Sequence, residues 1–109
     1  MEFTLNTSVR PPTITLTAHG ELDIFSARTM SRELRAIRDS GCPRVVVDVG
    51  AVSFVDASAL GVLARTVAAL EADSATMGFI ETSRQFRWLC SMTGLDVLFD
   101  LGPERVAVL

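Results

Sequence analysis

The chain has 109 residues, 49% of them hydrophobic and 21% charged, which predicts one packed domain over residues 1–109 and excludes a disordered chain. Its net charge of −3 argues against a nucleic acid or an anionic membrane as its partner. The sequence lacks an apolar run long enough to span a bilayer and the charge pattern of a secretory signal. We therefore expect a soluble, cytoplasmic protein.

The first half of the chain begins with two short segments in which apolar and polar residues alternate. This period predicts strands over residues 2–9 and 13–18, joined into a hairpin by a proline-containing turn at residues 10–12. Apolar residues then recur at spacings of three and four, which predicts an amphipathic helix. Ser26 is its expected N-cap, and the Ser-Gly pair at residues 40–41 is its expected end.

The second half alternates between strand and helix patterns. A β-branched run at residues 45–49 predicts a central strand buried on both faces, followed by a connecting loop over residues 50–55. Helical spacing predicts a second helix from about residue 57 to 73. Further patterns predict a strand at 75–81, a helix at 83–92, a short last strand at 97–99 and a tail at 103–109.

This order of elements predicts an α/β fold with a mixed, mostly parallel sheet, an N-terminal hairpin and about three helices. The carboxyl ends of parallel strands share one edge of a sheet, and ligand-binding groups gather in the loops at that edge. Those loops are expected at residues 19–26, 50–58 and 81–83. We expect a functional site there.

The densest polar group in these loops is the segment Asp56-Ala57-Ser58, which opens the second predicted helix. Unpaired N–H groups and the helix dipole favour an anion at a helix N-terminus, so a phosphate on Ser58 would leave the helix intact. It would also add between about −1.5 and −2 charges to the surface. The spacing alone leaves open a second interpretation, in which Asp56 or Ser58 simply caps the helix.

Three stretches of the sequence resemble a known family. They are Gly20-Glu21-Leu22-Asp23, the run VVVDVGAVSFVDASALGVL at residues 45–63, and TGLDVLFDL at residues 93–101. In this order they resemble the signature stretches of STAS domains, the anti-sigma factor antagonists, and they cover nearly the whole chain. The resemblance implies a single STAS-like domain.

The resemblance also implies a phosphorylation site. The core motif of the family is usually Asp-Ser-Ser-Gly-Leu, and its second serine accepts the phosphate. Here the motif reads Asp56-Ala57-Ser58-Ala59-Leu60, so the phosphate acceptor corresponds to Ser58 and the preceding acid to Asp56. Two positions depart from the pattern. Ala57 removes a neighbouring hydroxyl, and Ala59 replaces a glycine at a position where alanine favours the helix.

The function implied by this resemblance is partner switching in the control of sigma-factor-dependent transcription. The unphosphorylated protein would bind an anti-sigma factor that is also a serine kinase of the GHKL type. Phosphorylation of Ser58 would break that complex, and a serine phosphatase would restore it. The protein itself would catalyse nothing and need no cofactor. An alternative within the same fold is a STAS subunit of a lipid-transport or signalling-scaffold complex.

A partner surface on this edge would combine apolar and polar side chains. The candidates are Asp23, Phe25, Phe54, Asp56 and Ser58. For Phe25 and Phe54 the sequence leaves core burial open as an alternative. For Asp23 it leaves open a role as a helix cap.

Other polar residues have simpler interpretations. A hydrolase built from Ser58 and His19 is not favoured, because the G-x-S-x-G elbow is absent and the histidine precedes the serine. Two distant cysteines and one histidine do not suggest a metal site. The row Arg28, Arg32, Arg35 is either a solvated helix face or a contact for an acidic partner.

Overall fold

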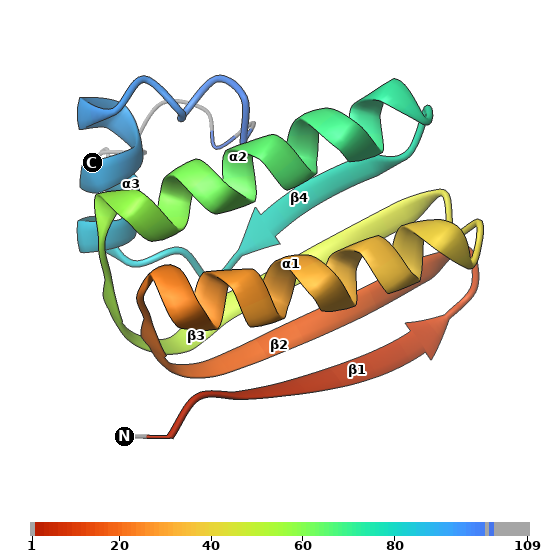
Figure 1. The fold of residues 1–109 in the computed structure, drawn as a ribbon, viewed down its shortest axis with the longest axis horizontal. Coiled ribbons are helices and arrows are strands. Elements are labelled where there is room, and N and C mark those ends of the chain that lie inside the picture. The colour runs from red at the N-terminus through yellow and green to blue at the C-terminus, as the bar shows by residue number, and fades with distance from the viewer. Residues whose placement is uncertain (1, 100, 102–109) are drawn as a thin grey trace, which may run out of the picture.

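The structure is a computed structural model that describes residues 2–99 and 101. The four strands form one sheet in the order β1-β2-β3-β4, with β1 antiparallel to β2 and the other pairs parallel. The predicted α/β fold with an N-terminal hairpin is therefore confirmed (Figure 1). The elements are β1 (Thr4–Arg10), β2 (Thr13–Leu22), α1 (Ile24–Asp39), β3 (Arg44–Val55), α2 (Ala57–Ala72), β4 (Thr76–Ile80) and α3 (Arg84–Met92).

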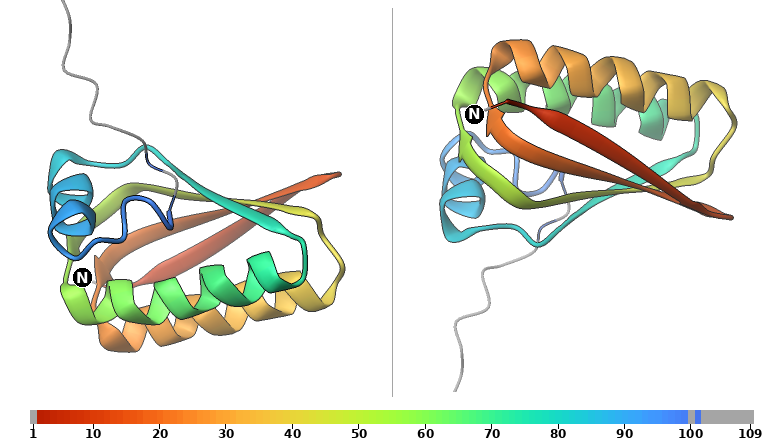
Figure 2. Two further views of the ribbon diagram at one scale, coloured as in Figure 1. Left: turned by 90° about the horizontal axis from the view of Figure 1, so that it is seen from above. Right: turned by 90° about the horizontal axis from the view of Figure 1, so that it is seen from below.

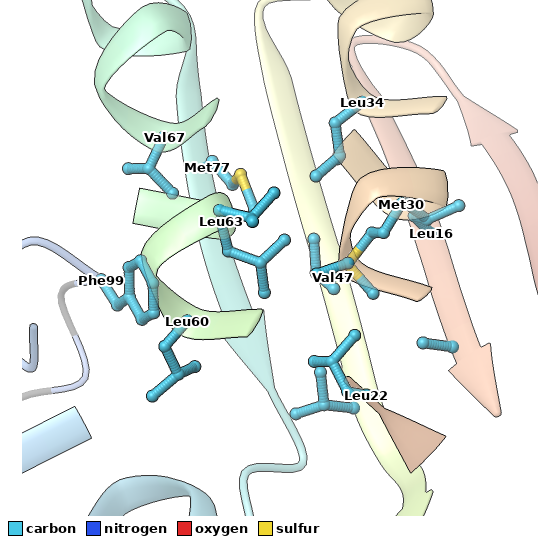
Figure 3. Packing of buried hydrophobic residues seen from close by; sticks show 14 of the residues in the cluster. Leu16, Leu22, Met30, Leu34, Val47, Leu60, Leu63, Val67, Met77 and Phe99 are labelled. Atoms are coloured by element: carbon cyan, nitrogen blue, oxygen red, sulfur yellow. The ribbon is translucent and has the colours of Figure 1, made fainter. Parts of the chain in front are cut away.

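Two helices, α1 and α2, lie side by side over one face of the sheet (Figures 1 and 2). Each turns its apolar stripe towards the sheet, because burying that stripe is what stabilises an amphipathic helix. Figure 3 shows Met30 and Leu63 from the helices among buried side chains that include Leu16, Val47 and Met77 from three strands. The described helices are all too short or too polar to cross a membrane.

A polar contact joins the two helices inside this layer. The hydroxyl groups of Ser31 on α1 and Thr66 on α2 lie 2.7 Å apart, and both residues are buried. The Thr66 hydroxyl also lies 3.3 Å from the Val62 carbonyl of its own helix. Since buried hydroxyl groups need partners, this pair favours one alignment of the helices. Both helices then begin at the same edge of the sheet.

The segment after α3 is not the strand that the sequence predicts. Residues 96–99 form a turn, in which the Phe99 N–H donates to the Leu95 carbonyl at 2.9 Å. The turn brings the fully buried Phe99 ring to 4.7 Å from the ring of Phe79 on β4. Burying this ring outweighs the strand preference of residues 97–99. The predicted tail at residues 103–109 lies outside the described residues.

The strands β2 and β3 are longer than predicted. The segment over residues 50–55 belongs to β3, so the predicted loop there is wrong. Two register shifts explain the error, because pairing with β2 moves from Thr17↔Asp48 to His19↔Ala51 and again before Glu21↔Phe54. Each shift leaves an extra residue in β3 and breaks the alternation by which a strand is recognised.

Candidate functional site

The candidate site lies at the edge of the sheet where β2 and β3 end. The Asp56 N–H donates to the Leu22 carbonyl at 3.2 Å, so the backbone hydrogen bonds between the two strands continue up to the first residue of the site. Asp23 follows Leu22 directly and caps α1, and Asp56 caps α2. Two acidic helix caps therefore stand next to each other on this edge.

Asp56 makes two hydrogen bonds with a single carboxylate oxygen. Its Oδ1 atom accepts the backbone N–H of Ala59 at 2.9 Å and the hydroxyl of Ser58 at 2.7 Å. The first bond is the N-cap of α2, so capping belongs to Asp56 and not to Ser58. Ser58 is exposed in the first turn of the helix, and its hydroxyl donates to a carboxylate. A hydroxyl in this position is accessible to a phosphoryl donor.

Asp23 is the N-cap of α1, and the predicted N-cap, Ser26, is the partner of that cap. The Ser26 N–H donates to Asp23 Oδ1 at 2.9 Å, and the Asp23 N–H donates to the Ser26 hydroxyl oxygen at 2.9 Å. This reciprocal pair is a capping box, which places the N-cap at Asp23, three residues before the predicted Ser26. The Ser26 hydroxyl also donates to the Glu21 carbonyl at 2.7 Å and so anchors the end of β2.

The capping box lowers the pKa of Asp23. Hydrogen bonds from the Ser26 backbone N–H, and then from its hydroxyl, hold the pKa of Asp23 below its ordinary value of 3.8. A lowered carboxyl pKa stabilises the fold above the unfolded pKa, and this stability is lost as the pH falls through the folded pKa. We therefore expect the stability advantage of the wild type over Asp23→Asn to shrink below about pH 4.

Urea unfolding of both proteins between about pH 6 and pH 2 measures this difference. Asparagine can still cap the helix but does not titrate, so the comparison cancels the other carboxyl groups. A difference in unfolding free energy that stays constant over the whole range would contradict the expectation.

The two candidate aromatic residues are both on the surface. Phe25, in the first turn of α1, is 72% exposed, and Phe54, near the end of β3, is 44% exposed. Core burial is therefore wrong for both. Phe54 pairs in register with Glu21, so it stands one row from the end of the sheet.

A shallow hollow of ≈ 280 Å³ adjoins the start of α1. Asp23 and Phe25 line it, so the structure brings these two candidates together, while Phe54 lines a separate and much smaller hollow with Ser83. Sequence reasoning missed Phe3 and Thr29 as lining residues. Phe3 comes from the start of the chain, and only the β1–β2 pairing brings it to this edge. The full lining consists of Phe3, Glu21, Asp23, Phe25, Ser26 and Thr29.

A family model described as "Mlab, STAS domain" matches residues 5–102, which is nearly the whole chain. The chain belongs to the STAS domain family. An anti-sigma-B factor antagonist of Staphylococcus aureus is 24% identical to this STAS domain over 102 residues, covering 94% of each chain.

Solved structures share the fold of this STAS domain. An anti-sigma factor antagonist from Mycobacterium paratuberculosis matches with a TM-score of 0.79 and 24% identity, over 90% of this chain and 83% of that one. The phosphorylated form of the Bacillus cell fate determinant SpoIIAA matches with a TM-score of 0.68 and 21% identity. That match covers 89% of this chain and 87% of the other. Such likenesses show that the sheet and helices have the same arrangement.

Proposed function

We propose that this protein is an anti-sigma factor antagonist that binds an anti-sigma factor and is released from it when Ser58 is phosphorylated. The observation that carries the proposal is the exposed Ser58 hydroxyl, held by Asp56 at the N-terminus of α2. The relatives named as antagonists support the same function. So does the existence of a phosphorylated form of one protein with this fold.

The proposed reaction needs an external kinase and ATP. The Ser58 oxygen attacks the γ-phosphorus of ATP, the bond to the leaving ADP breaks, and the hydroxyl proton passes to a base. Asp56 already accepts a hydrogen bond from this proton, so it orients the oxygen and is positioned to receive the proton. The kinase supplies the nucleotide site, and the antagonist supplies the acceptor. We expect that kinase to be the GHKL-type anti-sigma factor itself, and a serine phosphatase to reverse the step.

Phosphorylation changes the charge of this edge without requiring a change of fold. The phosphate carries between about −1.5 and −2 charges and sits in the first turn of α2, where the helix dipole tolerates an anion. It also stands beside the Asp56 carboxylate and near Asp23, so like charges accumulate on one surface. A partner whose surface fits the neutral Ser58 hydroxyl and Phe25 then meets a concentrated negative charge, which weakens its binding. Release follows from this electrostatic cost.

The proposal is tested by measuring how many phosphates the protein accepts and on which residue. Incubation with the cognate anti-sigma factor kinase and ATP is expected to add one phosphate, located on Ser58 by mass spectrometry of proteolytic peptides. Ser53 and Ser83 are suitable internal controls, because both are exposed serines near the same sheet edge. Ser83 caps α3, since its hydroxyl accepts the Phe86 N–H at 3.0 Å. Phosphate on either residue in place of Ser58 would contradict the proposal.

The alternative, a STAS subunit of a lipid-transport or scaffold complex, predicts a different result in the same experiment. Such a subunit would co-purify with its complex and form no ATP-sensitive complex with an anti-sigma factor. The antagonist proposal requires that ATP releases the protein from the anti-sigma factor. One binding assay with and without ATP therefore distinguishes the two functions.

A further inference from the structure

Four exposed arginines lie on the outer surface of the helical layer. They are Arg28, Arg32 and Arg35 on α1, and Arg65 on α2, and we call them the arginine patch. Residues spaced three and four apart lie on the same side of a helix, so the three arginines of α1 form one row. Arg32 and Arg65 are the sequence neighbours of the Ser31–Thr66 pair that joins the two helices. This pair brings the row and Arg65 onto one surface.

The arginine patch has no acidic partner in the part of the chain that the structure describes. The ion pairs found there involve Arg38, which lies 3.5 Å from Asp39 and 3.4 Å from Asp73. Arg38 thus ties the end of α1 to the end of α2. In the patch, by contrast, Arg32 donates only to the Thr29 hydroxyl, at 3.4 Å.

This arrangement does not stabilise α1 by itself. Positive charges three and four residues apart repel each other, and the first turn of the helix contains no acidic residue to offset them. Asp39, four residues after Arg35, continues the row, but its ion pair in the described residues is with Arg38 at 3.5 Å and not with Arg35. Positive charges that repel each other within α1 would be neutralised by an acidic surface on another molecule.

We infer that the arginine patch binds an acidic surface of the protein that docks on Ser58; this inference rests on the proposed function. The patch is continuous with the candidate site on both helices. Phe25, with 72% of its surface exposed, precedes Arg28 by one turn of α1. Ser58 precedes Arg65 by two turns of α2, roughly 10 Å along the helix axis. One partner can therefore cover the site and the patch together.

The charge distribution favours an acidic protein over a nucleic acid or an anionic membrane. The whole chain carries a net charge of −3, so an extended polyanion is repelled by most of the surface. A folded partner presents a compact acidic area that meets only the patch. Guanidinium groups also pair with carboxylates through two parallel hydrogen bonds, which gives such a contact a defined geometry.

The patch also links phosphorylation to the rate of association. Long-range attraction between complementary surfaces accelerates encounter and weakens with salt. A phosphate on Ser58 lies about one Debye length from Arg65 at physiological salt, close enough to reduce the positive potential of the patch. Phosphorylation would then slow binding as well as speed release.

The experiment compares two double variants that change the net charge equally. Arg28→Gln/Arg32→Gln alters the patch, and Arg10→Gln/Arg44→Gln alters two exposed arginines that flank Thr13 at the opposite end of the sheet. The probe is the kinase that phosphorylates Ser58, and association rates are measured by stopped flow at about 50 and about 200 mM salt. Circular dichroism and thermal unfolding check that both variants are folded.

We expect the patch variant to associate about tenfold more slowly at low salt and to lose about half of the salt dependence, since two of the four patch arginines remain. The control variant should stay within about twofold of the wild type. Equal changes in the two variants would show that net charge alone acts and would overturn the inference. Patch-dependent binding to duplex DNA or phosphatidylserine vesicles, in the absence of an effect on the kinase, would overturn it in favour of a polyanion. Failure of the wild type to bind the kinase at all would instead contradict the proposed function, and the inference with it.

Discussion

Ser58→Ala is expected to bind the anti-sigma factor kinase and to remain bound when ATP is added. The variant has no acceptor for the phosphate, so the charge that releases the partner is never formed. It loses the hydrogen bond to Asp56, but the Asp56 cap on Ala59 remains and alanine is the better helix former. We expect the unfolding free energy to change by less than about 1.5 kcal/mol. Size-exclusion chromatography of the complex with and without ATP measures the effect.

Ser58→Asp is the complementary variant, because it places a permanent negative charge at the position where Ser58→Ala can never carry one. A carboxylate brings less charge and fewer acceptor oxygens than a phosphate, so it should weaken the complex less than phosphorylation does. Calorimetry of both forms, with helical content checked by circular dichroism, gives the comparison. Release of Ser58→Ala by ATP would contradict the switch, and so would equal affinity of the phosphorylated and unphosphorylated wild type.

Phe86→Ala is expected to lower the unfolding free energy by about 3–5 kcal/mol. The Phe86 side chain is only 2% exposed, and its ring lies 5.5 Å from that of Phe79 on β4. Truncation would leave a cavity where α3 packs against the sheet. A domain of this size has a stability of about 5–15 kcal/mol, so the loss is a large part of the total. Urea unfolding measures it.

Phe25→Ala is the control for this truncation, because it removes the same ring from a position that is 72% exposed. Its unfolding free energy should stay within about 0.5 kcal/mol of the wild type. If Phe25 contacts the partner, the same variant should bind the kinase at least about tenfold more weakly, the effect of losing an interface anchor. Similar stabilities for Phe25→Ala and Phe86→Ala would contradict the packing described for α3.

The fold could be predicted from periodic patterns wherever one pattern ran without interruption. The helical spacing from Ala57 to Leu70 was sufficient, and α2 begins where it predicts. The end of β3 was not predictable in this way, since two extra residues opposite β2 disturb the alternation. At the start of α1, both Asp23 and Ser26 are suitable caps, and only the length of β2 decides between them.

The sequence was sufficient to predict the Asp56–Ser58 pair of the candidate site, but not the residues that surround it. Ser58 and Asp56 could be named because a local motif at a helix start carries the signal, and their contact is a local one. The hollow beside α1 depends on Phe3, which lies twenty residues before Asp23 and reaches it only through strand pairing. The exposure of Phe54 depends on a register shift. On α3 the buried side chains are Phe86 and Cys90, and Trp88 is 60% exposed.

The hydrogen bond from the Asp56 N–H to the Leu22 carbonyl has an entropic consequence for binding. Leu22 directly precedes Asp23, the N-cap of α1, and Asp56 is the N-cap of α2. The bond therefore ties the starts of both helices to the rigid sheet. A partner docking there finds the backbone already ordered and loses little affinity to the entropy of arranging it. Affinity then depends on the side chains and charges at the contact. A change as small as one phosphate can therefore shift the binding equilibrium without an opposing change in order.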